Sequence, residues 1–302
     1  MSGRLWIVLT IATILTVAAG NFTIAYAVDP YGLWRNPAGR QLPIAVTANG
    51  RKAKFLLSKR YVPTNFDGLI VGPSVLATWD LSSIAGTRVY NLSIDGADAA
   101  EEKLVVDQAL HQGHYKLAIF AINPTNTSSH SIKGGLDQTT TAEAFASVHL
   151  YIQEVAYALR AIHHRAGYVD IDSNGRYNRR IRKFLEPEVE DRARFQIDPV
   201  ALADFRNMIL TLQKQGAFIV YVVPPIYKPS YLLNKPYFQA YRATMVSTMP
   251  KAPVIDFNDP EYNALCSDPN NFADSEHTEP LGAVKFSLLL GELVSQAMTT
   301  GK

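Results

Sequence analysis

Five short apolar segments constrain the fold of this chain more than any other feature. Each is apolar on both faces and is soon followed by Gly, Pro, Asn or Asp; they lie at 66–71, 88–93, 115–122, 218–223 and 254–257. Helix-like stretches occupy 97–112, 142–165, 199–215, 237–249 and 281–298, and a further helix is expected from about Val75. Such an alternation is typical of a parallel sheet covered by helices on both sides. The sequence therefore predicts an α/β fold.

Composition narrows the class of protein. The chain has 302 residues, of which 47% are hydrophobic and 19% are charged, so it can bury a core and is neither disordered nor fibrous. Its net charge of +2 is too small to indicate a nucleic-acid partner. The single cysteine, Cys266, excludes an intramolecular disulfide framework and a multi-cysteine metal site. We expect no metal and no cofactor.

The N-terminus is a candidate membrane segment. Residues Leu5 to Val28 are uncharged and mostly apolar over about the length that crosses a bilayer, with Trp6 and Tyr26 near the two ends. One interpretation is a cleaved signal peptide with Ala25-Tyr26-Ala27 as the cleavage site. We favour the other, an uncleaved transmembrane helix within 1–28, because the apolar run is long for a signal peptide.

Charge does not decide the orientation of that segment. Only Arg4 precedes it, whereas five basic residues follow it: Arg35, Arg40, Arg51, Lys52 and Lys54. Counted literally, this bias places the body of the protein in the cytoplasm. Long exported domains, however, translocate largely regardless of charge, so both orientations stay open.

The rest of the chain divides into a neck at 29–65 and a sheet domain at 66–302. An insertion at about 126–195 interrupts the strand–helix alternation with a polar run, a long helix and a charged stretch. Within that stretch a basic cluster from Arg176 to Lys183 precedes acidic residues from Glu186 to Asp191. We interpret this run as a solvated helix face with internal ion pairs, or else as a contact surface for lipid headgroups, an anionic glycan or a partner protein.

Two segments far apart in the chain supply candidate catalytic residues. Asp274 and His277 are three residues apart in a loop ahead of the last helix, the spacing at which a carboxylate can orient an imidazole base. Ser74 follows the first apolar segment at the start of the expected helix, where backbone N–H groups favour a developing oxyanion. The alternative is that Ser74 only caps that helix.

Further candidates follow the second and third segments. Gly96 can supply an oxyanion-binding N–H or can be a plain turn glycine. Asn123 and Asn126 can supply an amide donor or can be turn formers around Pro124. Ligands of open α/β sheets bind beyond the carboxyl ends of the strands, so we expect all these residues in one site.

The order of these blocks resembles that of the SGNH (GDSL-like) hydrolase superfamily. The blocks are Val71-Gly72-Pro73-Ser74, then Asn91 to Gly96, Asn123 to Asn126, and Asp274-Ser275-Glu276-His277, and they cover most of the chain from Phe66 onward. The likeness is greatest to the membrane-anchored exported branch that includes the alginate acetylation and teichoic-acid D-alanylation proteins. Two departures are Gly-Pro-Ser in place of Gly-Asp-Ser and a third block without Gly-x-Asn-Asp.

The resemblance implies a flavodoxin-like three-layer α/β/α fold and assigns roles to the candidate residues. Ser74 would be the nucleophile, His277 the general base and Asp274 its orienting carboxylate. The Gly96 N–H, with that of Ser74, would bind the oxyanion, and Asn126 or Asn123 would be the candidate side-chain donor.

The resemblance also implies a function. We expect a serine-dependent O-acyltransferase or esterase that modifies a cell-envelope or secreted polysaccharide, as in O-acetylation, through an acyl-serine intermediate. Its partners would be an acyl donor, a polysaccharide acceptor and a multispanning membrane acyltransferase of the membrane-bound O-acyltransferase type. The location would be the bacterial inner membrane, with the catalytic domain on the periplasmic side. Two alternatives stay open: a catalytically silent glycan-binding or scaffold protein of the same fold, and a lipid esterase facing the cytoplasm.

Overall fold

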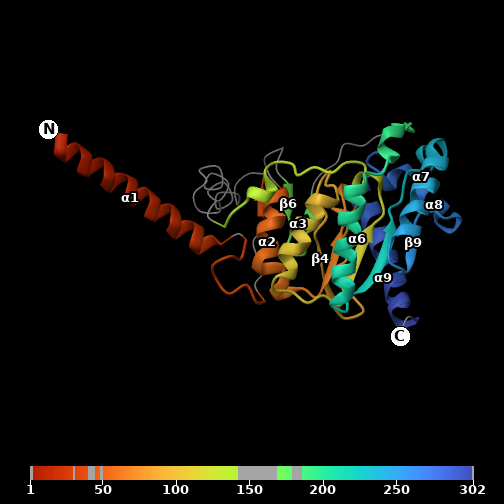
Figure 1. Ribbon diagram of the computed structural model, residues 1–302, viewed down its shortest axis with the longest axis horizontal. Helices are drawn as coiled ribbons and strands as arrows, with labels where there is room; N and C mark the ends of the chain where they lie inside the picture. Colours follow the sequence, from red (N-terminus) through yellow and green to blue (C-terminus); the bar gives the residue numbers. More distant parts are fainter. Residues whose placement is uncertain are drawn as a thin grey trace.

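The computed structural model describes residues 3–29, 31–39, 45–47, 50–141, 169–178 and 186–300. A long N-terminal helix, α1 (Gly3–Val28), extends away from a domain built around a twisted sheet (Figure 1). The predicted helix at 142–165 lies outside the described residues.

The main sheet has six strands, of which five are parallel. They are β2 (Gly68–Val71), β4 (Thr87–Asn91), β5 (Leu117–Ala121), β8 (Phe218–Val223) and β9 (Val254–Asp256). Across the sheet they lie in the order β4-β2-β5-β8-β9, and the short β3 (Ser83–Ile84) pairs antiparallel with β4 at the edge. Numbered along the chain, the parallel strands have the order 2-1-3-4-5 of flavodoxin-like sheets. The five predicted strand segments and the predicted α/β fold are confirmed.

Helices cover both faces of this sheet. Side chains alternate along each strand, so that Leu69 and Val71 pack in one core and Ile70 in the other. The first core includes residues of α2 (Gly50–Asn65), α3 (Ala99–Leu110), α6 (Pro199–Lys214) and α7 (Lys228–Thr248). The second core includes residues of α8 (Asn263–Ser267) and α9 (Pro280–Thr300). The architecture is therefore a three-layer α/β/α sandwich.

The helix predicted from Val75 is wrong. Only a single 3₁₀ turn, η1 (Ser74–Leu76), follows β2. The amide of Asn91 donates to the carbonyls of Leu76 and Trp79, and the Trp79 ring is fully buried and stacked on Phe286 at 5.9 Å between centroids. The chain thus turns into the β3–β4 hairpin instead of continuing as a helix.

The predicted neck at 29–65 is not irregular throughout, because α2 lies within it and packs against α3. The reason it escapes sequence reasoning is that its basic residues indicate exposure, whereas Lys54 is fully buried. The Lys54 ammonium donates to the carbonyls of Asn91 and Gly175 and lies over the rings of Tyr90 and Tyr177, at 5.3 and 4.9 Å from their centroids. These contacts hold α2 to the end of β4.

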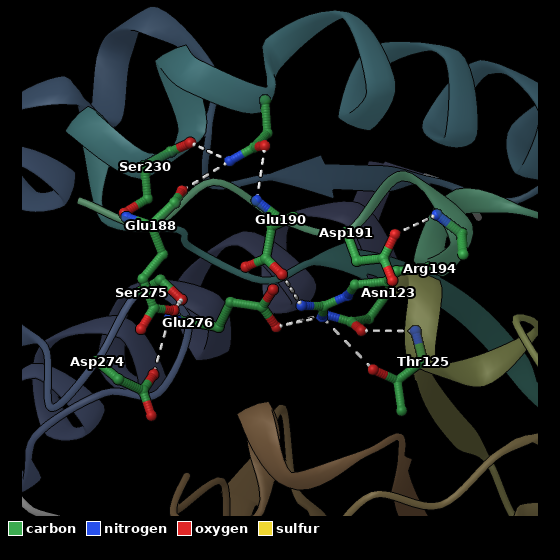
Figure 2. A network of polar contacts seen from close by, with 12 residues as sticks. Asn123, Thr125, Glu188, Glu190, Asp191, Arg194, Ser230, Asp274, Ser275 and Glu276 are labelled. Carbon is green, nitrogen blue, oxygen red and sulfur yellow. Dashed lines mark hydrogen bonds and ion pairs between the residues drawn. The ribbon is translucent and has the colours of Figure 1, made fainter.

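The described part of the insertion does not form a solvated helix. Residues 186–191 are irregular, and only η4 (Arg192–Phe195) follows. The backbone N–H groups of Glu188 and Glu190 donate to Ser230 and Asn234 of α7, so the acidic stretch lies along that helix (Figure 2). Residues 179–183 of the basic cluster lie outside the described residues, and Arg176 pairs with Asp172. A small antiparallel sheet joins β1 (Ala45–Thr47), β6 (Val169–Ile171) and β7 (Tyr177–Asn178).

Two described helices are long and apolar enough to cross a membrane, α1 and α9. One side of α9 packs against the sheet, whereas the large apolar side chains of α1 from Leu5 to Val17 are exposed. At the end of α1, the buried Asp29 carboxylate accepts hydrogen bonds from the N–H groups of Leu33 and Arg35. The Arg35 guanidinium in turn donates to the Ala27 carbonyl. These contacts fix the helix end to the segment that follows it, and Leu33 of that segment packs in the first core.

Four further 3₁₀ turns complete the described chain. They are η2 (Pro124–Asn126) after β5, η3 (Leu136–Gln138) in the polar run, and η5 (Pro260–Tyr262) with η6 (Pro269–Asn271) on either side of α8.

Candidate active site

Ser74 and His277 meet at the carboxyl edge of the sheet. The Ser74 hydroxyl oxygen lies 2.7 Å from His277 Nε2, although the two residues are 203 positions apart. On the other side of the ring, His277 Nδ1 lies 2.8 and 3.0 Å from the two carboxylate oxygens of Asp274. With Nδ1 carrying the proton toward Asp274, Nε2 is free to accept the proton of the serine hydroxyl.

A tight loop holds the histidine and the aspartate. Phe272 and Thr278 form an antiparallel bridge across its base, and the Ala273 N–H donates to the His277 carbonyl at 2.8 Å. Asp274 Oδ1 also accepts the backbone N–H groups of Glu276 and His277. Burial would raise the pKa of Asp274, but the hydrogen bonds from His277 and the backbone outweigh it and lower this pKa below its usual value. The carboxylate therefore stays charged opposite the imidazole.

The turn that presents Ser74 requires a glycine before it for reasons of space. A Cβ on Gly72 would lie 2.6 Å from the Cβ of Ala121 on the neighbouring strand. Pro73, not Ser74, is the N-cap of η1, and no side chain caps that turn. The serine hydroxyl is thus committed to His277 rather than to a helix cap.

Two residues that line the site have a backbone N–H group without an acceptor among the described residues. Within the described residues, neither the Ser74 N–H nor the Gly96 N–H has a hydrogen-bond acceptor, and both residues line the same cavity. Gly96 has a φ of 56°, which favours glycine at this position. Unpaired N–H groups beside a nucleophile are the usual donors to an oxyanion. The single 3₁₀ turn at Ser74 adds little helix dipole to them.

The two asparagines predicted as side-chain donors are occupied elsewhere. Asn123 and Asn126 cap η2 reciprocally, because the Asn123 oxygen accepts from the Thr125 N–H and the Asn126 oxygen accepts from the Asn123 N–H. The Asn126 amide donates to the buried Glu102 at 2.7 Å, and Asn126 is not among the described residues that line the cavity of Ser74. Both residues thus form the turn, and the Asn123 amide donates at 3.4 Å to Glu276, which lines the cavity of Ser74.

A cavity of about 450 Å³ opens above the serine. Besides the catalytic candidates and Gly96, its described lining includes charged or polar side chains: Thr125, Glu188, Glu190, Arg194, Ser275 and Glu276. Within the described residues, no group of three or more His, Cys, Asp or Glu side chains is placed to hold a metal ion.

A polar network that sequence reasoning missed crosses this cavity (Figure 2). Arg194 donates to Glu190 at 2.7 Å and to Glu276 at 2.6 Å, and the Ser275 hydroxyl donates to Glu188 at 2.9 Å. Burial raises the pKa of Glu276 above its usual value, although the Arg194 charge opposes this effect. The four-residue spacing of Glu190 and Arg194 was the available signal, but it indicates an ion pair and not its position in a site.

Comparison with known proteins adds one distant likeness. No protein-family model and no curated protein matches the sequence. A solved structure described as "a putative platelet activating factor from Streptococcus pneumonia" superimposes with a TM-score of 0.45 and 12% sequence identity, covering 81% of this chain and 90% of that chain. This similarity is too low to assign a family or an activity to the chain.

Proposed function

We propose that the protein is a serine-dependent esterase or acyltransferase. The observation that carries this proposal is the continuous hydrogen-bonded series Ser74 Oγ to His277 Nε2 at 2.7 Å and His277 Nδ1 to Asp274 at 2.8 Å. Reactive serine hydroxyls are activated by such an imidazole and carboxylate pair on many unrelated folds.

The reaction would proceed in two steps. Ser74 Oγ attacks the acyl carbonyl while His277 Nε2 accepts its proton, and the oxyanion is bound by the N–H groups of Ser74 and Gly96. The C–O bond to the leaving alcohol breaks as His277 returns the proton to that alcohol, which leaves an acyl-Ser74 ester. A sugar hydroxyl or water then attacks this ester, with His277 as base, and the proton finally returns to Ser74.

The expected acceptor is a hydroxyl of a cell-envelope or secreted polysaccharide. Support comes from the cavity of about 450 Å³, whose lining offers several carboxylate and hydroxyl groups that hydrogen-bond sugar hydroxyls. Further support comes from the order of the sequence blocks, which resembles that of exported acyl-transfer proteins. In that setting a multispanning membrane acyltransferase would deliver the acyl group, such as acetyl, to Ser74.

The proposed location is the bacterial inner membrane, with α1 retained and the sheet domain on the periplasmic side. Retention is supported by the state of the Ala25-Tyr26-Ala27 segment: Ala25 is 1% exposed and its carbonyl accepts the Asp29 N–H at 2.8 Å. A helical segment is a poor substrate for a peptidase that cleaves extended chain. The intact mass of the purified protein tests whether α1 is retained. A mass equal to that of a chain starting at Val28 would show that the segment is cleaved.

Ester cleavage tests the catalytic proposal. The full-length protein in detergent is expected to hydrolyse 4-nitrophenyl acetate and to react with a fluorophosphonate probe, whereas Ser74→Ala should do neither. Ser295→Ala is a matched control, because the Ser295 hydroxyl donates to the Gly291 carbonyl on α9 and is not among the described residues that line the cavity of Ser74. Equal rates for Ser74→Ala and the parent protein would rule out the nucleophile.

A second candidate function is a catalytically silent glycan-binding or scaffold protein. The observation that favours it is that the amide groups of Asn123 and Asn126 donate to Glu276 and Glu102, which leaves the oxyanion with backbone donors alone. Glycan binding without fluorophosphonate labelling of the parent protein would select this function over catalysis.

A further inference from the structure

The loop that carries Gly96 is a defined turn. The Ala97 N–H donates to the Ile94 carbonyl at 3.2 Å, so residues 94–97 form a hydrogen-bonded β-turn. A positive φ of 56° at its third residue, Gly96, is the mark of the type II form. Types I and II differ by a flip of the central peptide, which here joins Asp95 to Gly96.

The direction of this peptide decides where the Gly96 N–H points. In a trans peptide the C=O and the N–H point in opposite directions, and the structure has no cis peptide among its described residues. If the Asp95 carbonyl points away from the cavity that Ser74 lines, the Gly96 N–H of the same peptide points into that cavity. In the flipped turn the carbonyl oxygen would take the place of the N–H and would repel an oxyanion.

Arg51 of α2 holds the Asp95 carbonyl. Its guanidinium donates to that oxygen, and Arg51 is not among the described residues that line the cavity. The carbonyl therefore points away from Ser74. On the next peptide, Lys133 Nζ donates to the Gly96 carbonyl at 2.8 Å.

A buried carboxylate in turn holds Arg51. Glu101, in the first turn of α3 and 0% exposed, pairs with the Arg51 guanidinium. The same carboxylate accepts the backbone N–H of Lys133 at 2.9 Å. The Glu101 carboxylate thus orients both Arg51 and Lys133, the two residues that bond to the carbonyls of the turn.

We propose that Arg51 is a positioning residue for acyl transfer: it locks the Asp95–Gly96 peptide in the orientation that presents the Gly96 N–H to the oxyanion. This inference rests on the proposed function, because it concerns the oxyanion site of the Ser74 reaction. Arg51 makes no contact with the substrate and acts only through the peptide.

The test compares Arg51→Gln, Arg51→Lys and the parent full-length protein with 4-nitrophenyl acetate. Loss of one oxyanion donor lowers kcat about 10²- to 10³-fold in other enzymes, and a donor that is only mispositioned part of the time should cost less. We expect kcat of Arg51→Gln to fall about 10- to 100-fold while KM changes less than about twofold, and Arg51→Lys to recover most of the loss. Arg60→Gln is the matched control, since Arg60 also lies on α2 and donates to a backbone carbonyl, that of Leu33.

A second measurement separates positioning from general destabilisation. A trifluoromethyl ketone forms a hemiketal oxyanion with the serine, so its affinity should fall in Arg51→Gln by the same factor as kcat/KM. Unchanged ketone affinity, a loss confined to KM, or an equal loss in Arg60→Gln would overturn the inference. Absence of esterase activity and probe labelling in the parent protein would instead overturn the proposed function itself.

Discussion

Arg194 donates a hydrogen bond of 2.6 Å to Glu276, the residue immediately before the histidine that we assign as general base. The same guanidinium pairs with Glu190, so a single cation joins the loop of the triad to the acidic stretch that lies along α7. The side chains of Glu276 and Glu190 are only 7% and 13% exposed. The pairing therefore matters for the stability of the site as well as for its shape.

Arg194→Met is expected to destabilise the protein by about 3–5 kcal/mol, because it leaves two largely buried carboxylates without their cation. Urea unfolding measures the loss, and Arg194→Met with Glu276→Gln should regain part of it. Arg192→Met is the control, since Arg192 is exposed on the same turn. Equal effects of the two arginine variants would contradict this account of the network.

Asp274→Asn is expected to lower kcat about 10⁴-fold with the fold intact, because the amide no longer holds His277 in the tautomer that accepts a proton at Nε2. Steady-state ester hydrolysis measures the fall in kcat, and circular dichroism measures whether the fold is intact. Asp268→Asn serves as the control, because Asp268 caps η6 and pairs with Lys285, and it is not among the described residues that line the cavity of Ser74. A fall of less than tenfold in Asp274→Asn would exclude an orienting role.

The buried Lys54 is expected to make the free energy of unfolding increase with pH. Burial lowers its pKa from 10.5 to about 7, against the raising effect of Asp172 and Asp95. Between these two values the unfolded chain binds one proton more than the folded chain, so the free energy of unfolding increases with pH there, by about 1 kcal/mol per pH unit.

Lys54→Met should remove this increment. The measurement is urea unfolding of both proteins between pH 7.5 and 9, and the difference in slope isolates the lysine from the other titrating groups. Identical slopes would show that Lys54 keeps its ordinary pKa in the folded protein.

Gly282→Ala is expected to displace the start of the loop that carries Asp274 and His277. A Cβ at this position in the first turn of α9 would lie 2.1 Å from the Asn271 carbonyl oxygen, so the helix or the loop has to move. We expect a loss of about 2 kcal/mol or more in stability, together with a lower kcat. Gly291→Ala on the same helix has room, with its nearest atom at 3.9 Å, and should be neutral or stabilising.

The strands were predictable because burial on both faces leaves a continuous apolar pattern, as in β5 and β8, and each ends at Pro, Asn or Gly. The pairing of Ser74 with His277 was predictable for a related reason: loops at the carboxyl edge of a parallel sheet converge. Both predictions depend on local pattern and topology alone.

What escaped prediction depends on contacts between distant polar groups. The helix expected after Ser74 fails because Asn91, from another strand, takes the carbonyls of Leu76 and Trp79. From the sequence, Lys54 and Arg194 are expected to be exposed cations. Only the tertiary structure places the carbonyl and carboxylate oxygens that accept their hydrogen bonds in the interior. No spacing rule in one sequence reveals such partners.

The position of Ser74 after the first parallel strand and of His277 after the last has a consequence for biosynthesis. A chain is made from its N-terminus, so the serine is synthesised 203 residues before the imidazole that we propose as its base. Until the C-terminal helix has docked, the hydroxyl has no base and reacts no faster than any other serine. On the proposed mechanism, an unfinished or prematurely ended chain would therefore not react with acyl esters.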